Sequence, residues 1–188
     1  MPVMGKTYES ITPEHQAFIE SQPLFFVASA PLSSGGHVNL SPKGLDALRV
    51  IDASTVMYLD LTGSGNETAA HVTENGRVTI MFCAFQGNPK ILRLYCRGQI
   101  LTRGTPEWDD ARARFPPLPG VRQIVVGRVQ SVQTSCGFGV PLLSFAEQRD
   151  QLNRWAENRG DAGMIEYRRT RNAISLDGLL TPATDPVE

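Results

Sequence analysis

Six β-rich runs constrain the fold of this chain more than any other feature of its sequence. In the run at 91–101, the apolar residues Leu92, Leu94 and Cys96 alternate with polar ones. A period of two places successive side chains on opposite faces of a strand, so this run predicts a half-buried β-strand. The run at 78–85 is nearly all apolar, which predicts a strand buried on both faces. The full set of predicted strands is 24–30, 38–40, 55–61, 78–85, 91–101 and 123–134.

Helix signals are few. Thr12 and Thr105 are each followed by proline and glutamate, the pattern of an N-cap with proline at the first helical position. Ser144 has capping-box spacing and predicts a helix to about residue 158, with Gly160 as its stop. A short helix is also predicted at 67–75. Strands and helices do not alternate as a doubly wound sheet requires. We therefore predict a mostly β (α+β) fold, a six-stranded antiparallel β-barrel with peripheral helices.

Composition narrows the functional classes. The chain has 188 residues, which suits one domain, and its 18 Lys+Arg against 19 Asp+Glu argue against a protein that coats nucleic acid or an anionic membrane. Three widely spaced cysteines form no C-x-x-C pair, so we expect neither a disulfide framework nor a metal site. Residues 1–22 carry no signal pattern, and the apolar run at 24–28 is far too short to span a membrane. We expect a cytoplasmic protein.

A glycine-rich loop between a strand and a helix is the best candidate for a binding site. The strand at 55–61 runs into the loop at 62–66, and the helix at 67–75 follows. Loop amides and a helix N-terminus favour an anion, Asn66 is a suitable N-cap, and Thr68 offers a hydroxyl. A plain turn before a capped helix is an equally good interpretation. The loop lacks the third glycine of a dinucleotide-binding fingerprint, and no Walker motif is present.

Basic residues near this loop add a second clue. Residues 75–106 contain no Asp or Glu but include several cations, among them Arg93 and Arg97 on one face of the same predicted strand. Such cations supply positive potential to a bound phosphate, unless acids from elsewhere in the fold pair with them. Lys43 ends the second predicted strand beside a tight turn, where it serves either as a phosphate counter-charge or as an ordinary surface residue.

Four segments in this order resemble the pyridoxamine 5'-phosphate oxidase-related family, which has the FMN-binding split-barrel fold. They are residues 37–44, 58–71, 74–82 and 94–98, and the resemblance covers about 22–134. It implies a split barrel in a single domain spanning 1–188, with a C-terminal helical extension at about 142–188. It also implies a homodimer that binds FMN at the subunit interface and acts on a small molecule.

The resemblance also implies roles for individual residues. The strand at 38–41 would lie along the flavin, the segment at 59–62 beside its ring system, and Lys43 near the ribityl or phosphate group. The turn that opens the helix at 67–75 would bind the phosphate, and a side chain on the strand at 91–101 would lie against the isoalloxazine edge. The implied cofactor-binding residues are Asn39, Ser41, Lys43, Leu59, Thr62, Asn66, Thr68 and Arg93.

The functional hypothesis is an FMN-dependent oxidoreductase acting on a small molecule whose identity, like the catalytic residues, is unknown. In the oxidases proper the phosphate turn carries a Ser-Arg-Lys type motif, whereas this chain has Asn66-Glu67-Thr68. The alternative is therefore a non-catalytic protein that binds flavin, haem or the deazaflavin F420 on the same fold. Cys136 in a glycine-bearing loop, the basic cluster at 168–171 and the segment at 172–179 receive no firm role.

Overall fold

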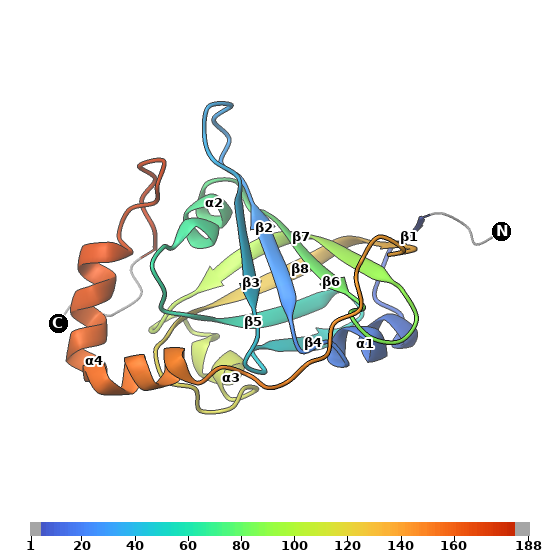
Figure 1. Cartoon of the computed structure of the whole chain (residues 1–188). Coiled ribbons are helices and arrows are strands. Elements are labelled where there is room, and N and C mark those ends of the chain that lie inside the picture. The colour runs from blue at the N-terminus through green and yellow to red at the C-terminus, as the bar shows by residue number, and fades with distance from the viewer. Residues whose placement is uncertain (1–4, 183–188) are drawn as a thin grey trace.

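The computed structural model describes residues 5–182 and places eight strands in one antiparallel sheet that curls into an open barrel (Figure 1). The sheet order is β3-β2-β6-β7-β8-β5-β4, and β1 pairs with β8. The edge strands β3 and β4 are not paired with each other, so the barrel is split at this seam. The strands are β1 (Lys6–Tyr8), β2 (Phe25–Ser29), β3 (Asn39–Lys43), β4 (Leu48–Asp52), β5 (Thr55–Leu61), β6 (Arg77–Cys83), β7 (Ile91–Leu101) and β8 (Val121–Ser135).

All six predicted strands are present, and β5 and β7 have the predicted bounds. The predicted count of six was too low, because β1 and β4 were missed. β1 has only three residues, and β4 is half-buried along most of its length, so neither shows a clear alternation. β3 extends through Pro42 to Lys43. Proline is tolerated there because β3 is an edge strand, where one ladder donor is not needed.

Two apolar clusters fill the fold, and the alternation of the strands separates them. Val56 and Tyr58 of β5 face the barrel interior, where they join residues of β2, β6, β7 and β8. Leu59, which follows Tyr58 and points to the opposite face of β5, belongs to a second cluster that packs against α3 (Trp108–Arg112) together with Ile124 of β8. Side chains that point to opposite faces of one sheet thus supply both clusters.

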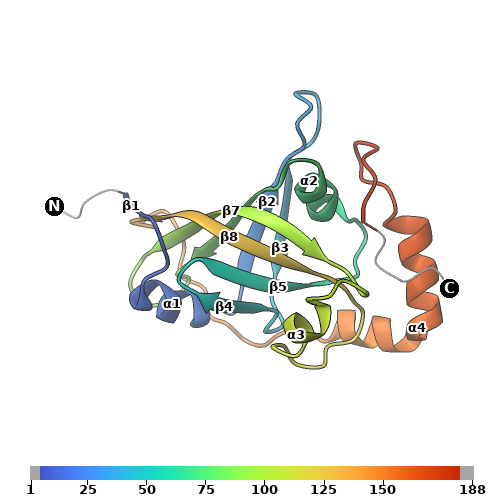
Figure 2. The same ribbon diagram turned by 180° about the vertical axis from the view of Figure 1, so that it is seen from behind.

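The helices lie outside the barrel (Figure 2). α1 (Pro13–Glu20) begins as predicted, because the Thr12 hydroxyl accepts a hydrogen bond from the His15 amide at 3.2 Å. α2 (Glu67–Asn75) has the predicted bounds and ends at Gly76, whose φ of 70° is readily accessible to glycine. Within the described residues, no helix has the length and apolar character needed to cross a membrane.

The helix predicted from Ser144 to about residue 158 is present only in its second half, so its predicted start was wrong. Residues 141–150 have no regular structure, and α4 (Gln151–Arg171) begins later. Gly160 does end a helical segment, as predicted, because its φ of 65° and ψ of 173° are non-helical, and a second segment of α4 begins beyond this kink. The capping-box signal is overridden by tertiary contacts, since the Leu143 amide donates to the Phe85 carbonyl at 2.9 Å and the Gln148 side chain bonds to the barrel. Beyond its kink, α4 runs along one end of the barrel, and the chain after it turns toward α2 (Figure 1).

Candidate functional site

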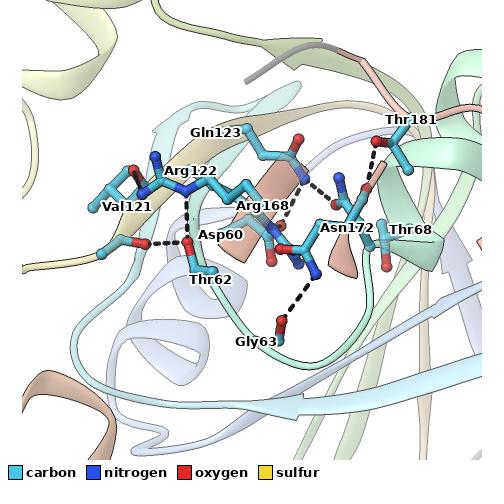
Figure 3. Close-up of polar contacts among 12 residues, drawn as sticks. Asp60, Thr62, Gly63, Thr68, Val121, Arg122, Gln123, Arg168, Asn172 and Thr181 are labelled. Carbon is cyan, nitrogen blue, oxygen red and sulfur yellow. Dashed lines mark hydrogen bonds and ion pairs between the residues drawn. The ribbon is translucent and has the colours of Figure 1, made fainter. Parts of the chain in front are cut away.

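A buried carboxylate lies at the centre of a polar cluster between the barrel and α4 (Figure 3). Asp60 of β5 accepts hydrogen bonds from Lys43 Nζ at 3.0 Å, from Arg122 Nε at 2.8 Å and from Gln123 Nε2 at 2.7 Å. The side chain of Asp60 is 2 % exposed and that of Arg122 is 5 % exposed. The cluster therefore joins β3, β5 and β8 across the seam of the split barrel.

The strand register explains how two consecutive residues of β8 reach one carboxylate. Asp60 pairs directly with Gln123, which places both side chains on the same face. The register then shifts, so that Leu61 pairs with Val121 and leaves Arg122 without a partner on β5. A bulge of this kind turns the side chain of the extra residue. Arg122 consequently reaches Asp60 beside Gln123 instead of pointing to the opposite face.

Electrostatics keep Asp60 ionised. Burial by itself raises the pKa of a carboxyl group, but here the charges of Arg122 and Lys43, with their hydrogen bonds, outweigh it and hold the pKa of Asp60 well below its usual range. Two cations thus surround one carboxylate, and their charge exceeds that of Asp60 by one.

The start of α2 adjoins this cluster and contains unsatisfied polar atoms. Asn66 occupies the N-cap position, but its side chain does not cap the helix, contrary to the prediction. Instead its Oδ1 accepts a hydrogen bond from Gln123 Nε2 at 2.7 Å. Asn66 Nδ2 and Gln123 Oε1 are buried and have no hydrogen-bond partner among the described residues. Nearby, the Thr68 hydroxyl accepts a hydrogen bond from Asn39 Nδ2 at 3.0 Å. An unpartnered buried amide is costly, so it marks a position suited to a ligand atom.

The C-terminal extension closes one side of the cluster (Figure 3). Arg168 Nε donates to the Thr62 hydroxyl at 2.9 Å. Asn172 accepts a hydrogen bond from Arg122 Nη1 at 2.9 Å and donates one to the Gly63 carbonyl at 3.0 Å. Arg168 of the basic cluster and Asn172 of the segment after it therefore hold the glycine-rich loop against the barrel.

The structure brings together most of the predicted cofactor-binding residues. Asn39, Lys43, Thr62, Asn66 and Thr68 all lie in or beside the Asp60 cluster. The cluster also contains three central residues that sequence reasoning missed. A lone acid in an otherwise apolar strand could have suggested Asp60, whereas no local pattern sets Arg122 or Gln123 apart. These contacts are observed, whereas the cofactor-binding roles of the residues remain predictions.

The other predicted residues lie apart from the cluster. Ser41 is half-buried and pairs with Val27 of β2, and Leu59 is 1 % exposed within the apolar cluster against α3. Arg93 points away from the barrel interior and donates to the Ser135 hydroxyl at 3.2 Å. The cations of residues 75–106 do not gather at one site. Arg97 donates to the Asn75 carbonyl, and Lys90 pairs with Glu14.

Comparison with known proteins shows which protein family the chain belongs to. The family model of pyridoxamine 5'-phosphate oxidase matches residues 11–136. The chain is 40 % identical to the pyridoxamine 5'-phosphate oxidase family protein ustO of Aspergillus flavus, over 95 % of this chain and 77 % of that protein. The chain therefore belongs to the pyridoxamine 5'-phosphate oxidase family, as the four sequence segments predicted.

Solved structures confirm the fold. A Lactobacillus delbrueckii protein considered a pyridoxamine 5'-phosphate oxidase superposes with a TM-score of 0.53 at 15 % identity, over 69 % of this chain and 98 % of that chain. HupZ of Group A Streptococcus gives a TM-score of 0.51 at 23 % identity, over 65 % of this chain and 91 % of that chain. The prediction of a mostly antiparallel split barrel with peripheral helices is thus confirmed.

Proposed function

We propose that the protein is an FMN-dependent oxidoreductase that acts on a small molecule and works as a homodimer. The observation that carries the proposal is the Asp60 cluster at the start of α2, in a chain that belongs to the pyridoxamine 5'-phosphate oxidase family. It combines surplus positive charge, a helix N-terminus and a buried amide with no partner among the described residues. Those are the features that a flavin phosphate needs.

The residues at the start of α2 fit an anionic group. The Lys43 side chain is 20 % exposed and, within residues 5–182, makes one hydrogen bond, to Asp60. An ammonium has three donors, so Lys43 has capacity for another acceptor. Asn66 Nδ2 and the first amides of α2 add further donors. Glu67 in the first turn would repel a phosphate, but its carboxylate accepts from the Leu176 amide at 3.0 Å and 3.2 Å and is held toward the C-terminal segment.

When bound, FMN supplies the electron or hydride transfer, and the protein supplies binding and orientation. Lys43 and Asn66 would hold the phosphate at the start of α2. Asp60 keeps Lys43 in place and, through Gln123, fixes the amide of Asn66. The contacts of Arg168 and Asn172 with the glycine-rich loop would exclude water from this end of the cofactor.

A second copy of the chain would complete the site. The edge strand β3 and the turn before it carry Val38 and Leu40, which are 74 % and 63 % exposed. Exposed apolar side chains on an unpaired sheet edge favour coverage by another protein surface. We expect light scattering on the purified protein to give the mass of a dimer.

Titration of the purified protein with FMN, followed by quenching of flavin fluorescence, tests the proposal. We expect micromolar binding, and we expect Lys43→Gln to weaken it by about 1–3 kcal/mol, which is about 5- to 150-fold. Lys90→Gln is the control, because Lys90 is also partly buried and ion-paired but contacts Glu14 away from the cluster. No binding at micromolar FMN, or equal losses in both variants, would overturn the proposal.

One observation favours the non-catalytic alternative. Lys43 and Arg122 already bind Asp60. Glu67 stands where the oxidases proper carry a cation, so fewer positive charges would hold a phosphate here than in those oxidases. A protein of this kind would bind its ligand without turning it over. Anaerobic reduction of the FMN complex by nicotinamide donors, followed by reoxidation in air, separates the two functions. Rates no faster than those of free FMN support the binding protein. Parallel titrations with F420 and haem test the remaining ligands.

A further inference from the structure

A groove lies on the barrel beside β3 and beneath the irregular segment that precedes α4. The groove has a volume of about 1060 Å³. One wall comes from the residues around Pro23, another from Pro42 to Leu45 at the end of β3, and a third from the turn between β6 and β7 at Phe85. Most of residues 143–152 line it as well. We call residues 143–148 the strap, which belongs to the orange segment before α4 in Figure 1. The volume of the groove is close to the upper limit for sites that bind small organic molecules.

The strap is held at both ends. Near its start the Leu143 amide donates to the Phe85 carbonyl at 2.9 Å. At its end Gln148 Nε2 donates to the Pro23 carbonyl at 2.9 Å, and Gln148 Oε1 accepts from the Leu45 amide at 3.1 Å. Gln148 therefore bridges two walls of the groove. A second cavity of about 750 Å³ adjoins this point, since Phe145 and Gln148 line both cavities.

The lining combines apolar surface with one anchored cation. Leu143 and Phe145 of the strap are 55 % and 52 % exposed, although they are large apolar residues. Among the described residues, the charged side chains of the lining are Lys43, Glu147 and Arg149, which together carry one excess positive charge. Glu147 and Arg149 lie on an exposed segment and offset each other, whereas Lys43 is fixed in the wall by its ion pair with Asp60 at 3.0 Å. The groove is thus complementary to a molecule with an apolar body and one negative charge.

We propose that the groove beneath the strap binds an organic acid, with its apolar body against Leu143 and Phe145 and its acid group against Lys43. This goes beyond the proposed function, because it concerns a different cavity and requires no bound flavin. Lys43 is the one residue that the two sites share, so the decisive variants are placed on the strap.

Two fluorescent probes test the inference on the full chain. ANS has an aromatic body with one sulfonate, and N-phenyl-1-naphthylamine is a comparable uncharged molecule. We expect saturable binding of both probes, with ANS at least tenfold tighter. Leu143→Asp should weaken ANS at least tenfold, because it places a carboxylate in the groove. Leu142→Asp is the control, since Leu142 is 77 % exposed and adjacent in sequence but does not line the groove.

Further measurements make the result decisive. Lys43→Gln should weaken ANS at least fivefold while changing binding of the uncharged probe less than twofold, which separates loss of charge from loss of the fold. FMN binding should be unchanged in Leu143→Asp, so failure of this inference and failure of the flavin proposal give different results. Equal effects of Leu143→Asp and Leu142→Asp would overturn the inference. ANS affinity that falls as protein concentration rises would also overturn it, because the groove would then hold a second copy.

Discussion

Replacing Asp60 by asparagine should destabilise the protein strongly. The substitution keeps the size of the side chain but removes its charge, which leaves Lys43 and Arg122 facing each other without the carboxylate that both contact. The Arg122 side chain is only 5 % exposed, so water cannot readily take the place of that carboxylate. Removing one partner from a buried ion pair costs about 3–5 kcal/mol, because an uncompensated charge remains in the interior.

The magnitude can be converted into a melting temperature. For a chain of this size, 1 kcal/mol corresponds to about 2–4 °C, so Asp60→Asn should lower the Tm by about 6–20 °C. Thermal and urea unfolding of both proteins, followed by circular dichroism, would measure the change. Asp46→Asn is the matched control, since the Asp46 carboxylate pairs with Arg49 at 2.7 Å but its side chain is 70 % exposed. An exposed pair contributes about 1 kcal/mol or less.

A further result distinguishes electrostatics from packing. Without the carboxylate, the two cations should bind an added anion, so inorganic phosphate should raise the Tm of Asp60→Asn more than that of the wild type. If Asp60→Asn costs no more than Asp46→Asn and phosphate has no selective effect, the reasoning about the buried cluster is refuted.

Three more predictions follow from the structure. The pKa of Asp60 is lowered in the folded state, so its contribution to stability is present above about pH 4 and is lost as pH falls toward the folded pKa. In urea unfolding at a series of pH values, the free energy of unfolding of Asp60→Asn should therefore fall less steeply below about pH 4 than that of the wild type. Burial raises the pKa of Cys96 to about 12 and also raises the pKa of Cys83, whereas Cys136 is only half-buried. Ellman's reagent at pH 8 should therefore label Cys136 first, and all three thiols only after unfolding. Gly76→Ala should cost about 1–2 kcal/mol in urea unfolding, because the residue has φ 70° and an added Cβ would meet Arg97; an unchanged unfolding midpoint would contradict this account of the α2 terminus.

Much of the fold follows from local sequence patterns. The alternation of apolar residues over 91–101 and the run at 55–61 gave the bounds of β7 and β5, since period-two patterning needs only near neighbours. The cap at Thr12 and Gly76 after α2 likewise act within one helical turn. The same type of signal failed at Ser144, where hydrogen bonds from the strap to distant parts of the barrel replaced a helix.

The candidate site, like the fold, was predicted from the sequence only in part. The sequence by itself determined the family, six of the strands, and the position of Asn66 and Thr68 at the start of α2. Only the tertiary structure decided that Asp60, Arg122 and Gln123 meet at a bulge, that Arg93 points elsewhere, and that Asn172 closes the cluster. Asp60 and Gln123 are 63 positions apart, and Arg122 and Asn172 are 50 apart. The reason is physical: local patterns fix backbone conformation and which face is buried, whereas a buried charge is stabilised by partners that only the register of a folded sheet brings together.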